Sequence, residues 1–257
     1  MEPTFLDLAA SGLRAQQTRL DLVAHNLANL QTPGFRSFRA ELVDLPADPN
    51  VFGLTTPLGL TTADAPTRGV QVARTLQPDR AGAPVPTGAP LDLALPDGVY
   101  LAVQLPGGQT AYTRDGHLGV TAQGTFQVGT FPLAMGARLQ PGDGAPAVDA
   151  NGRIVATGPN GPRVVGSLPL VRFANPEGLL PLGNGVLAAT AESGPPRPYT
   201  PAGPDRPAPG ALEASNVDLA QELTTLIRAQ RAYQLNAQMV RTWDELAGGT
   251  IQDLGHA

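Results

Sequence analysis

Histidine is the side chain that most often carries acid–base or metal chemistry near neutral pH, and this chain has three of them. They are His25, His117 and His256, and no two have the spacing that would place both on one metal ion. The chain has no cysteine, which excludes disulfides, thiol catalysis and cysteine-bound metal. We therefore expect no metal site and no cofactor.

Aspartate is the other candidate for acid–base chemistry, because a pair of carboxyl groups can act as general acid and base. The candidates in the middle of the chain are Asp92, Asp97, Asp115 and Asp149. Asp97-Gly98 and Asp115-Gly116 are turn dipeptides, so a role in turns is the better interpretation. The glycine-rich run at residues 157–161 lacks the Lys-Ser/Thr of a phosphate-binding loop. An enzyme is thus the weakest of the functional alternatives.

Charge and hydropathy exclude two further classes of function. Charged residues make up 15% of the chain and the net charge is −5, so a basic surface for nucleic acid is not expected. No run of eighteen apolar residues occurs, and Asp7, Arg14, Arg19 and Asp21 interrupt the segment where a cleaved signal peptide would need apolar residues. We expect neither a membrane span nor a cleaved signal.

The two ends of the chain carry the strongest structural pattern, a heptad seam of apolar residues on long predicted helices. The helices are predicted over residues 4–30 and 217–254, with lengths of roughly 40 and 55 Å. Thr4 with Asp7, and Ser215 with Asp218, fit capping boxes at their starts, and Thr32-Pro33-Gly34 ends the first helix. The residues expected to mediate subunit assembly are Leu6, Leu13, Leu20, Val23, Leu27, Leu30, Leu219, Leu223, Leu226, Tyr233, Val240 and Ile251.

Between these helices the sequence alternates short β-prone runs with glycine turns. Residues 98–105 and 109–113 flank Pro106-Gly107-Gly108 and predict a hairpin, and further short strands are expected near residues 117–128, 147–157 and 163–173. Seven prolines in residues 193–209 favour an extended strap. The sequence thus predicts an α+β fold of four parts, listed by residue range: a terminal helical assembly unit (1–32 and 212–257), an extended connector (33–84), a β-rich domain (85–192) and a proline-rich return strap (193–211).

Specific motifs in both helices resemble those of bacterial flagellar rod and hook proteins. The first is Ser11 to Gln17 with Asn26 to Arg36, and the second is Leu212 to Leu219 with Gln230 to Tyr233 and Asn236. The blocks at residues 90–94, 112–116 and 173–179 resemble parts of the rod proteins' β-domain, so the resemblance spans nearly the whole chain. His25 stands where the family usually has Asn, and Pro96 to Tyr100 replaces its usual Gly-Asp-Gly-aromatic-aromatic block.

This resemblance implies a structural subunit of the flagellar basal-body rod, in the distal rod rather than the proximal one. The terminal helices would polymerise into a helical shaft that transmits torque from motor to hook. The implied partners are further copies of the chain, other rod subunits, the hook protein, ring (bushing) proteins and the flagellar export apparatus. The implied location is the basal body, reached by type III export across the inner membrane without a cleaved signal peptide.

Local hydrogen-bonding roles follow from the same motifs. We expect Asn26, Asn29 and Asn216 to form turn or inter-helix hydrogen bonds, and the other turn or motif residues are Thr32, Pro33, Gly34, Phe35 and Ser215. Two further alternatives stay open at this point. One is a secreted β-rich binding or adhesive module with coiled-coil ends, and the other is a flagellar hook-type subunit.

Overall fold

The computed structural model describes residues 5–45, 69–78, 80–158, 161–203 and 205–254, and it divides into two compact units. The first unit contains residues 1–27, 38–76 and 218–257, and the second contains residues 28–37 and 77–217. The two helices, which lie near opposite ends of the sequence, thus belong to one unit. The segment after the first helix belongs to the unit that also contains the β-rich region.

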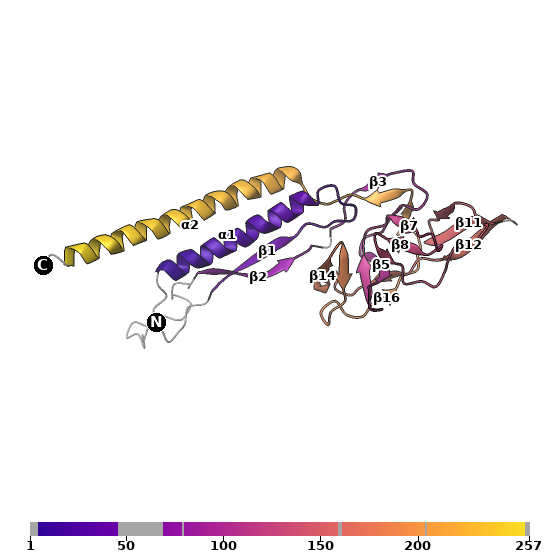
Figure 1. Cartoon of the computed structure of the whole chain (residues 1–257), viewed down its shortest axis with the longest axis horizontal. Coiled ribbons are helices and arrows are strands. Elements are labelled where there is room, and N and C mark those ends of the chain that lie inside the picture. The colour runs from indigo at the N-terminus through magenta and orange to yellow at the C-terminus, as the bar shows by residue number, and fades with distance from the viewer. Residues whose placement is uncertain (1–4, 46–68, 79, 159–160, 204, 255–257) are drawn as a thin grey trace. The chain divides into compact units, whose positions relative to one another are not determined.

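Among the described residues, the first unit consists of two helices and one pair of antiparallel strands (Figure 1). Helix α1 spans Phe5–Ala28, helix α2 spans Leu219–Leu254, and strands β1 (Arg39–Asp44) and β2 (Val70–Leu76) pair antiparallel. Gly12 lies opposite Asn236, and Asn26 lies opposite Glu222, so the two helices run antiparallel. The prediction of two long packed helices is confirmed.

The capping box predicted at Ser215 is wrong. The Asp218 carboxylate accepts from the backbone N–H groups of Ala220 and Gln221, at 2.9 and 3.2 Å. Asp218 is therefore the N-cap, because the N-cap side chain accepts from the second and third helical residues. Its carboxylate also lies at the positive end of the helix dipole, which favours a negative charge there. Thr4, the predicted cap of α1, lies outside the described residues.

The paired strands that the structure describes in the second unit all run antiparallel, and they form one large sheet, two small ones and two ribbons. The six-stranded sheet has the order β14-β15-β6-β5-β13-β16, and the three-stranded sheets are β10-β11-β12 and β7-β8-β9. The ribbons are β17-β4 and β18-β3. The strand bounds are β3 Pro84–Pro86, β4 Leu93–Ala94, β5 Val99–Gln104, β6 Thr110–Thr113, β7 Leu118–Val120, β8 Phe126–Val128, β9 Phe131–Pro132, β10 Pro146–Val148, β11 Arg153–Gly158, β12 Gly161–Ser167, β13 Leu170–Arg172, β14 Leu180–Gly183, β15 Val186–Ala188, β16 Arg197–Pro198, β17 Ala208–Pro209 and β18 Ala211–Glu213.

Strand β5 is the centre of this unit, and it is buried on both faces. Val99, Leu101 and Val103 are fully covered on one face, within the main hydrophobic core. Tyr100 and Ala102 lie on the other face, in a second cluster with Tyr112 and Phe173. Burial on both faces explains why residues 99–103 read as a continuous apolar run. The predicted hairpin of residues 98–113 is confirmed as β5 and β6.

Two segments differ from the sequence-based description. Residues 39–44 form β1, a strand that the sequence analysis did not predict, and it pairs with the whole of β2. The proline-rich segment also pairs with the β-domain, through β16 against β13 and β17 against β4. Each of these proline-containing strands is an edge strand, where a proline that cannot donate a hydrogen bond is tolerated.

Candidate assembly site

Asn26 is the polar centre of the helical unit, with a side chain that is 1% exposed. Its amide nitrogen donates to the Phe38 carbonyl at 2.9 Å and to Glu222 Oε1 at 3.1 Å. Its amide oxygen accepts from the Phe38 backbone N–H at 2.8 Å. One side chain therefore joins the last turn of α1, the residue before β1 and the first turn of α2.

Glu222 provides a pH-dependent element in the same place, because partial burial raises the pKa of its carboxyl group and the Asn26 hydrogen bond only partly offsets this. A carboxyl whose pKa is higher in the folded protein binds its proton more tightly there than in the unfolded chain. The contribution of Glu222 to the free energy of unfolding therefore increases as the pH falls from the raised pKa towards the ordinary pKa of a glutamate.

We predict that wild type gains stability relative to Glu222→Gln when the pH is lowered from 7 to 4. Denaturant unfolding of both proteins at several pH values, followed through helix content, measures this difference. Glutamine does not titrate, and the two proteins share every other titratable group. The difference between their unfolding free energies therefore reports the pH effect of Glu222 alone. A difference in unfolding free energy that stays constant or shrinks on acidification would contradict the prediction.

The turn after α1 is held by the second unit's own residues. The backbone carbonyl of Asn29 accepts a hydrogen bond from the Thr32 N–H at 3.1 Å. The side-chain oxygen of Asn29 accepts one from the Thr32 hydroxyl, also at 3.1 Å. Asn216 accepts from the Ser37 N–H and donates to the Arg80 carbonyl, both at 2.7 Å. These bonds fix residues 29–37 against the strand that returns towards α2.

Gly34 is required by the backbone at this turn. Its φ is +67°, and a Cβ there would lie 2.8 Å from the carbonyl of Arg114. Gly88 has nearly the same φ, +72°, but a Cβ there would meet nothing within 4 Å. Substituting alanine at each of these two glycines therefore distinguishes the free-energy cost of the left-handed conformation from the cost of the steric contact.

We predict that Gly34→Ala destabilises the second unit more than Gly88→Ala does. Both variants lose about 1–2 kcal/mol through the left-handed conformation, and Gly34→Ala loses about 1–3 kcal/mol more because the β-domain must shift to admit the methyl group. Thermal and denaturant unfolding of the two variants measure the difference. Equal unfolding free energies would contradict the prediction.

Three charged residues, Arg36, Arg114 and Glu213, form a buried charge cluster in the second unit. Their side chains are only 3–4% exposed. Arg114 Nε and Nη2 donate to Glu213 Oε2 at 2.8 and 2.5 Å, and Arg36 Nη2 lies 3.6 Å from Glu213 Oε1. Burial, together with repulsion from Arg114, lowers the pKa of Arg36. One carboxylate thus balances two buried guanidinium groups.

Further bonds complete this cluster. Arg36 Nη2 donates to Asp97 Oδ1 at 2.9 Å, and Arg114 Nη1 donates to the Val99 carbonyl at 2.8 Å. Glu213 Oε1 also accepts from the Gly82 backbone N–H at 3.0 Å. This cluster was not predicted from the sequence. Arg36, Arg114 and Glu213 each lie in one of the motifs quoted above. The presence of two arginines and one glutamate in these motifs is the signal that could have indicated the pairing.

The structure places the predicted assembly residues on different parts of the helical pair. Val23 is buried, whereas Leu219, Leu223 and Tyr233 expose 44, 42 and 37% of their surface. Intermediate exposure is found at Leu13, Leu20, Leu27, Leu30, Leu226 and Val240. The side chains of Leu6 and Ile251 lie outside the described ones. The apolar residues therefore serve two purposes, since some cover the partner helix and others face outward.

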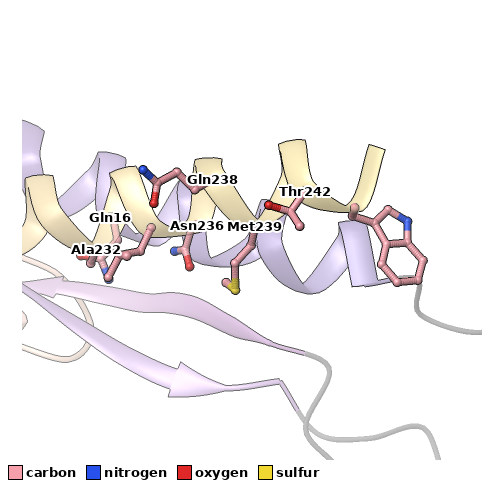
Figure 2. Close-up of a pocket in the computed structure, with 8 residues that line it drawn as sticks. Gln16, Ala232, Asn236, Gln238, Met239 and Thr242 are labelled. Atoms are coloured by element: carbon pink, nitrogen blue, oxygen red, sulfur yellow. The ribbon is translucent and has the colours of Figure 1, made fainter. Parts of the chain in front are cut away.

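Further exposed apolar residues on α2 were not in the predicted seam. They are Ile227, Leu235, Met239 and Trp243, with 51, 61, 44 and 43% exposure. The last three border a groove of about 800 Å³ that also includes Gln16 of α1 (Figure 2). Neighbouring exposed apolar side chains of this kind mark interaction surfaces.

The residues considered for acid–base chemistry have structural contacts instead. His117 Nδ1 lies 2.7 Å from Asp92 Oδ1, and the Thr87 hydroxyl donates to Asp92 Oδ2. Asp115 accepts the backbone N–H of His117, and Asp149 accepts that of Arg153, both as turn residues do. Within the part of the chain that the structure describes, no three His, Asp or Glu side chains gather where they could hold a metal ion. His256 lies outside that part.

Comparison with protein families gives a match at each end of the chain. A model described as "Flagella basal body rod protein" matches residues 6–36, and one described as "Flagellar basal body rod FlgEFG protein C-terminal" matches residues 208–253. These ranges contain nearly all of α1 with its following turn, and β18 with nearly all of α2. They also include Arg36 and Glu213 of the buried charge cluster.

Similar curated proteins align along nearly the whole chain. "Flagellar basal-body rod protein FlgG" of Caulobacter vibrioides is 34% identical over 96% of this chain and 98% of its own length. The protein of the same name from Borreliella burgdorferi is 33% identical over 93% of this chain and 94% of its own length. "Flagellar basal-body rod protein FlgF" of Mesorhizobium japonicum is 30% identical over 97% of each chain. The similarity therefore includes the β-domain as well as both helices.

Proposed function

Since this chain belongs to the flagellar basal-body rod protein family, we propose that its copies polymerise through α1 and α2 into a shaft that transmits torque from motor to hook. The observation that carries this proposal is the helical unit, which is made from both ends of the chain and has exposed apolar residues along α2. A contact that does not close on itself generates a helical filament, which is the symmetry of a shaft.

The distal rod is the position that we propose along the shaft. Support comes from relatives named FlgG that align over more than nine-tenths of the chain. A relative named FlgF aligns over a similar length. The position along the rod is therefore tested separately from rod membership, through the point at which the rod stops when the chain is missing.

The proposed partners follow from a place in the shaft. They are further copies of this chain, neighbouring rod subunits, the hook protein, ring (bushing) proteins and the flagellar export apparatus that would deliver the chain across the inner membrane. Among the described residues, no helix is both long enough and apolar enough to cross a membrane. We assign recognition of these partners to the outward side chains of α2, which are exposed in the single chain, and to the β-domain.

Two earlier alternatives have less support. A secreted adhesive module would need only the β-domain, yet both terminal helices match rod-protein models and the relatives named as rod proteins align from end to end. A hook-type subunit shares the C-terminal family description, which covers several axial proteins. The full-length relatives cited here carry rod-protein names.

Electron microscopy of basal bodies from cells that lack this gene tests the proposal. We expect a rod that stops short and carries no hook, and we expect the wild-type gene to restore the full length. A rod that is complete and carries a hook in the absence of the gene would overturn the proposal. A rod that is lost from its motor-proximal part onward would retain rod function but overturn the distal position.

A further inference from the structure

Helix α2 carries two separate apolar surfaces, and the structure describes both within the helical unit. The first is the amino-terminal stripe, formed by Leu219, Leu223 and Ile227, each at least 42% exposed. The second is the groove that runs along α2 from Ala232 to Trp243, with Gln16 of α1 at its side. Figure 2 shows Asn236 and Met239 projecting on the groove side of α2, with Gln16 and Ala232 near one end.

The two surfaces lie on different sides of one rigid helix. Leu223 and Met239 are sixteen positions apart, which corresponds to about 160° around the helix and about 24 Å along it. Ala229, between them in sequence, is 1% exposed. The stripe and the groove therefore flank the buried face of α2, and one copy of the chain cannot bring them together.

Size and charge make the two surfaces complementary. The stripe extends over about 12 Å and the groove over about 16 Å, at the rise of an α-helix. None of the described residues that border the groove is charged. Of the residues between the stripe positions only Glu222 is charged, and its carboxylate accepts a hydrogen bond from Asn26 of α1. A charged occupant would lose its hydration in such a groove without gaining a partner.

We propose that the groove of one copy receives the amino-terminal stripe of a second copy, so that α2 packs against α2 in a head-to-tail series. The inference rests on the proposed polymerisation and names the two surfaces that meet. A contact between unlike surfaces on identical chains is heterologous, and it can repeat without closing. The set of α2 residues assigned to the assembly contact thereby also includes Ile227, Leu235, Met239 and Trp243.

Disulfide cross-linking tests this pairing, because the chain contains no cysteine of its own. The test compares full-length Leu223→Cys, Met239→Cys and the double variant in basal bodies from cells whose motility each variant supports. We expect a ladder of linked oligomers from the double variant and none from either single variant. The matched control combines Leu223→Cys with Gln234→Cys, which lies on an exposed part of α2 outside the groove, and should give no ladder.

Several results would overturn the pairing. Linked dimers from Leu223→Cys alone would mean that like surfaces meet in a two-fold contact. A ladder equally strong in the control, or no ladder from the double variant in motile cells, would mean that other surfaces meet. In motile cells the rod is assembled, so these outcomes reject the pairing while leaving the proposed function intact.

Fluorescence provides a second measurement that needs no substitution. Trp243 is the only tryptophan of the chain and borders the groove with 43% exposure. Polymerisation of the purified wild-type chain should shift its emission to shorter wavelength, because the stripe of the neighbour would cover the indole. An emission maximum that is unchanged in the polymer would overturn the proposal.

Discussion

Glu213→Ala is expected to destabilise the protein by about 3–5 kcal/mol, because it leaves two buried guanidinium groups without their shared carboxylate. Arg36 and Arg114 cannot reach solvent from this position, since their side chains are 3–4% exposed. Asp97 still accepts from Arg36, but its side chain is 63% exposed and contributes little screening of Arg114. The midpoint temperature of thermal unfolding should fall by roughly 10 °C.

Thermal and denaturant unfolding of the purified protein, followed through its β-sheet signal, measure this loss. Glu192→Ala is the matched control, because it removes an exposed carboxylate from the same unit and alters the net charge equally. The control should unfold like wild type within about 0.5 kcal/mol. If Glu213→Ala also unfolds like wild type, the buried charge cluster does not stabilise the second unit.

Leu223→Asp is expected to abolish incorporation into the rod while the chain still folds. Leu223 is 42% exposed in the single chain, so an aspartate there remains in water and changes the unfolding free energy little. In a polymer that covers this position, the carboxylate would be buried without a partner, at a cost of several kcal/mol for each subunit. Leu20 and Leu226 are poorer choices, since both are half-buried within the helical pair.

Motility, basal-body electron microscopy and unfolding of the purified chain measure the three parts of this prediction. Gln221→Asp is the matched control, because it places the same charge within the same turn of α2 but on the opposite side of the helix. The control should assemble. Rods of normal length that contain Leu223→Asp would show that the amino-terminal stripe does not take part in assembly.

The sequence predicted the elements that depend on local pattern. Apolar spacing and breakers at Pro33 and Gly34 indicated α1, which ends at Ala28, and the hairpin around Gly107 and Gly108 followed from turn residues. The capping residue of α2 was misassigned because Ser215 and Asp218 are both good caps. The cap is the residue whose side chain reaches the first backbone N–H groups of α2, and residue types alone do not specify which residue that is.

Long-range pairing is what the sequence did not predict. Strand β1 has mixed polarity and becomes a strand through its partner β2, more than twenty residues away. The buried charge cluster joins Arg36 to Glu213 across 177 positions, and no local pattern specifies such a pairing. The heptad seam likewise showed that α1 and α2 are amphipathic, but it did not show which apolar residues face the other helix and which face outward.

Hydrogen exchange of the purified chain, before and after polymerisation, tests most directly whether the terminal helices are the assembly unit. We expect the amides of residues 219–245 to exchange much more slowly in the polymer, because neighbouring copies would suppress opening of α2. Amides of β5 and β6 should exchange at the same rate in both states. Equal protection of α2 before and after polymerisation, with slowing confined to the β-domain, would contradict assembly through the helices.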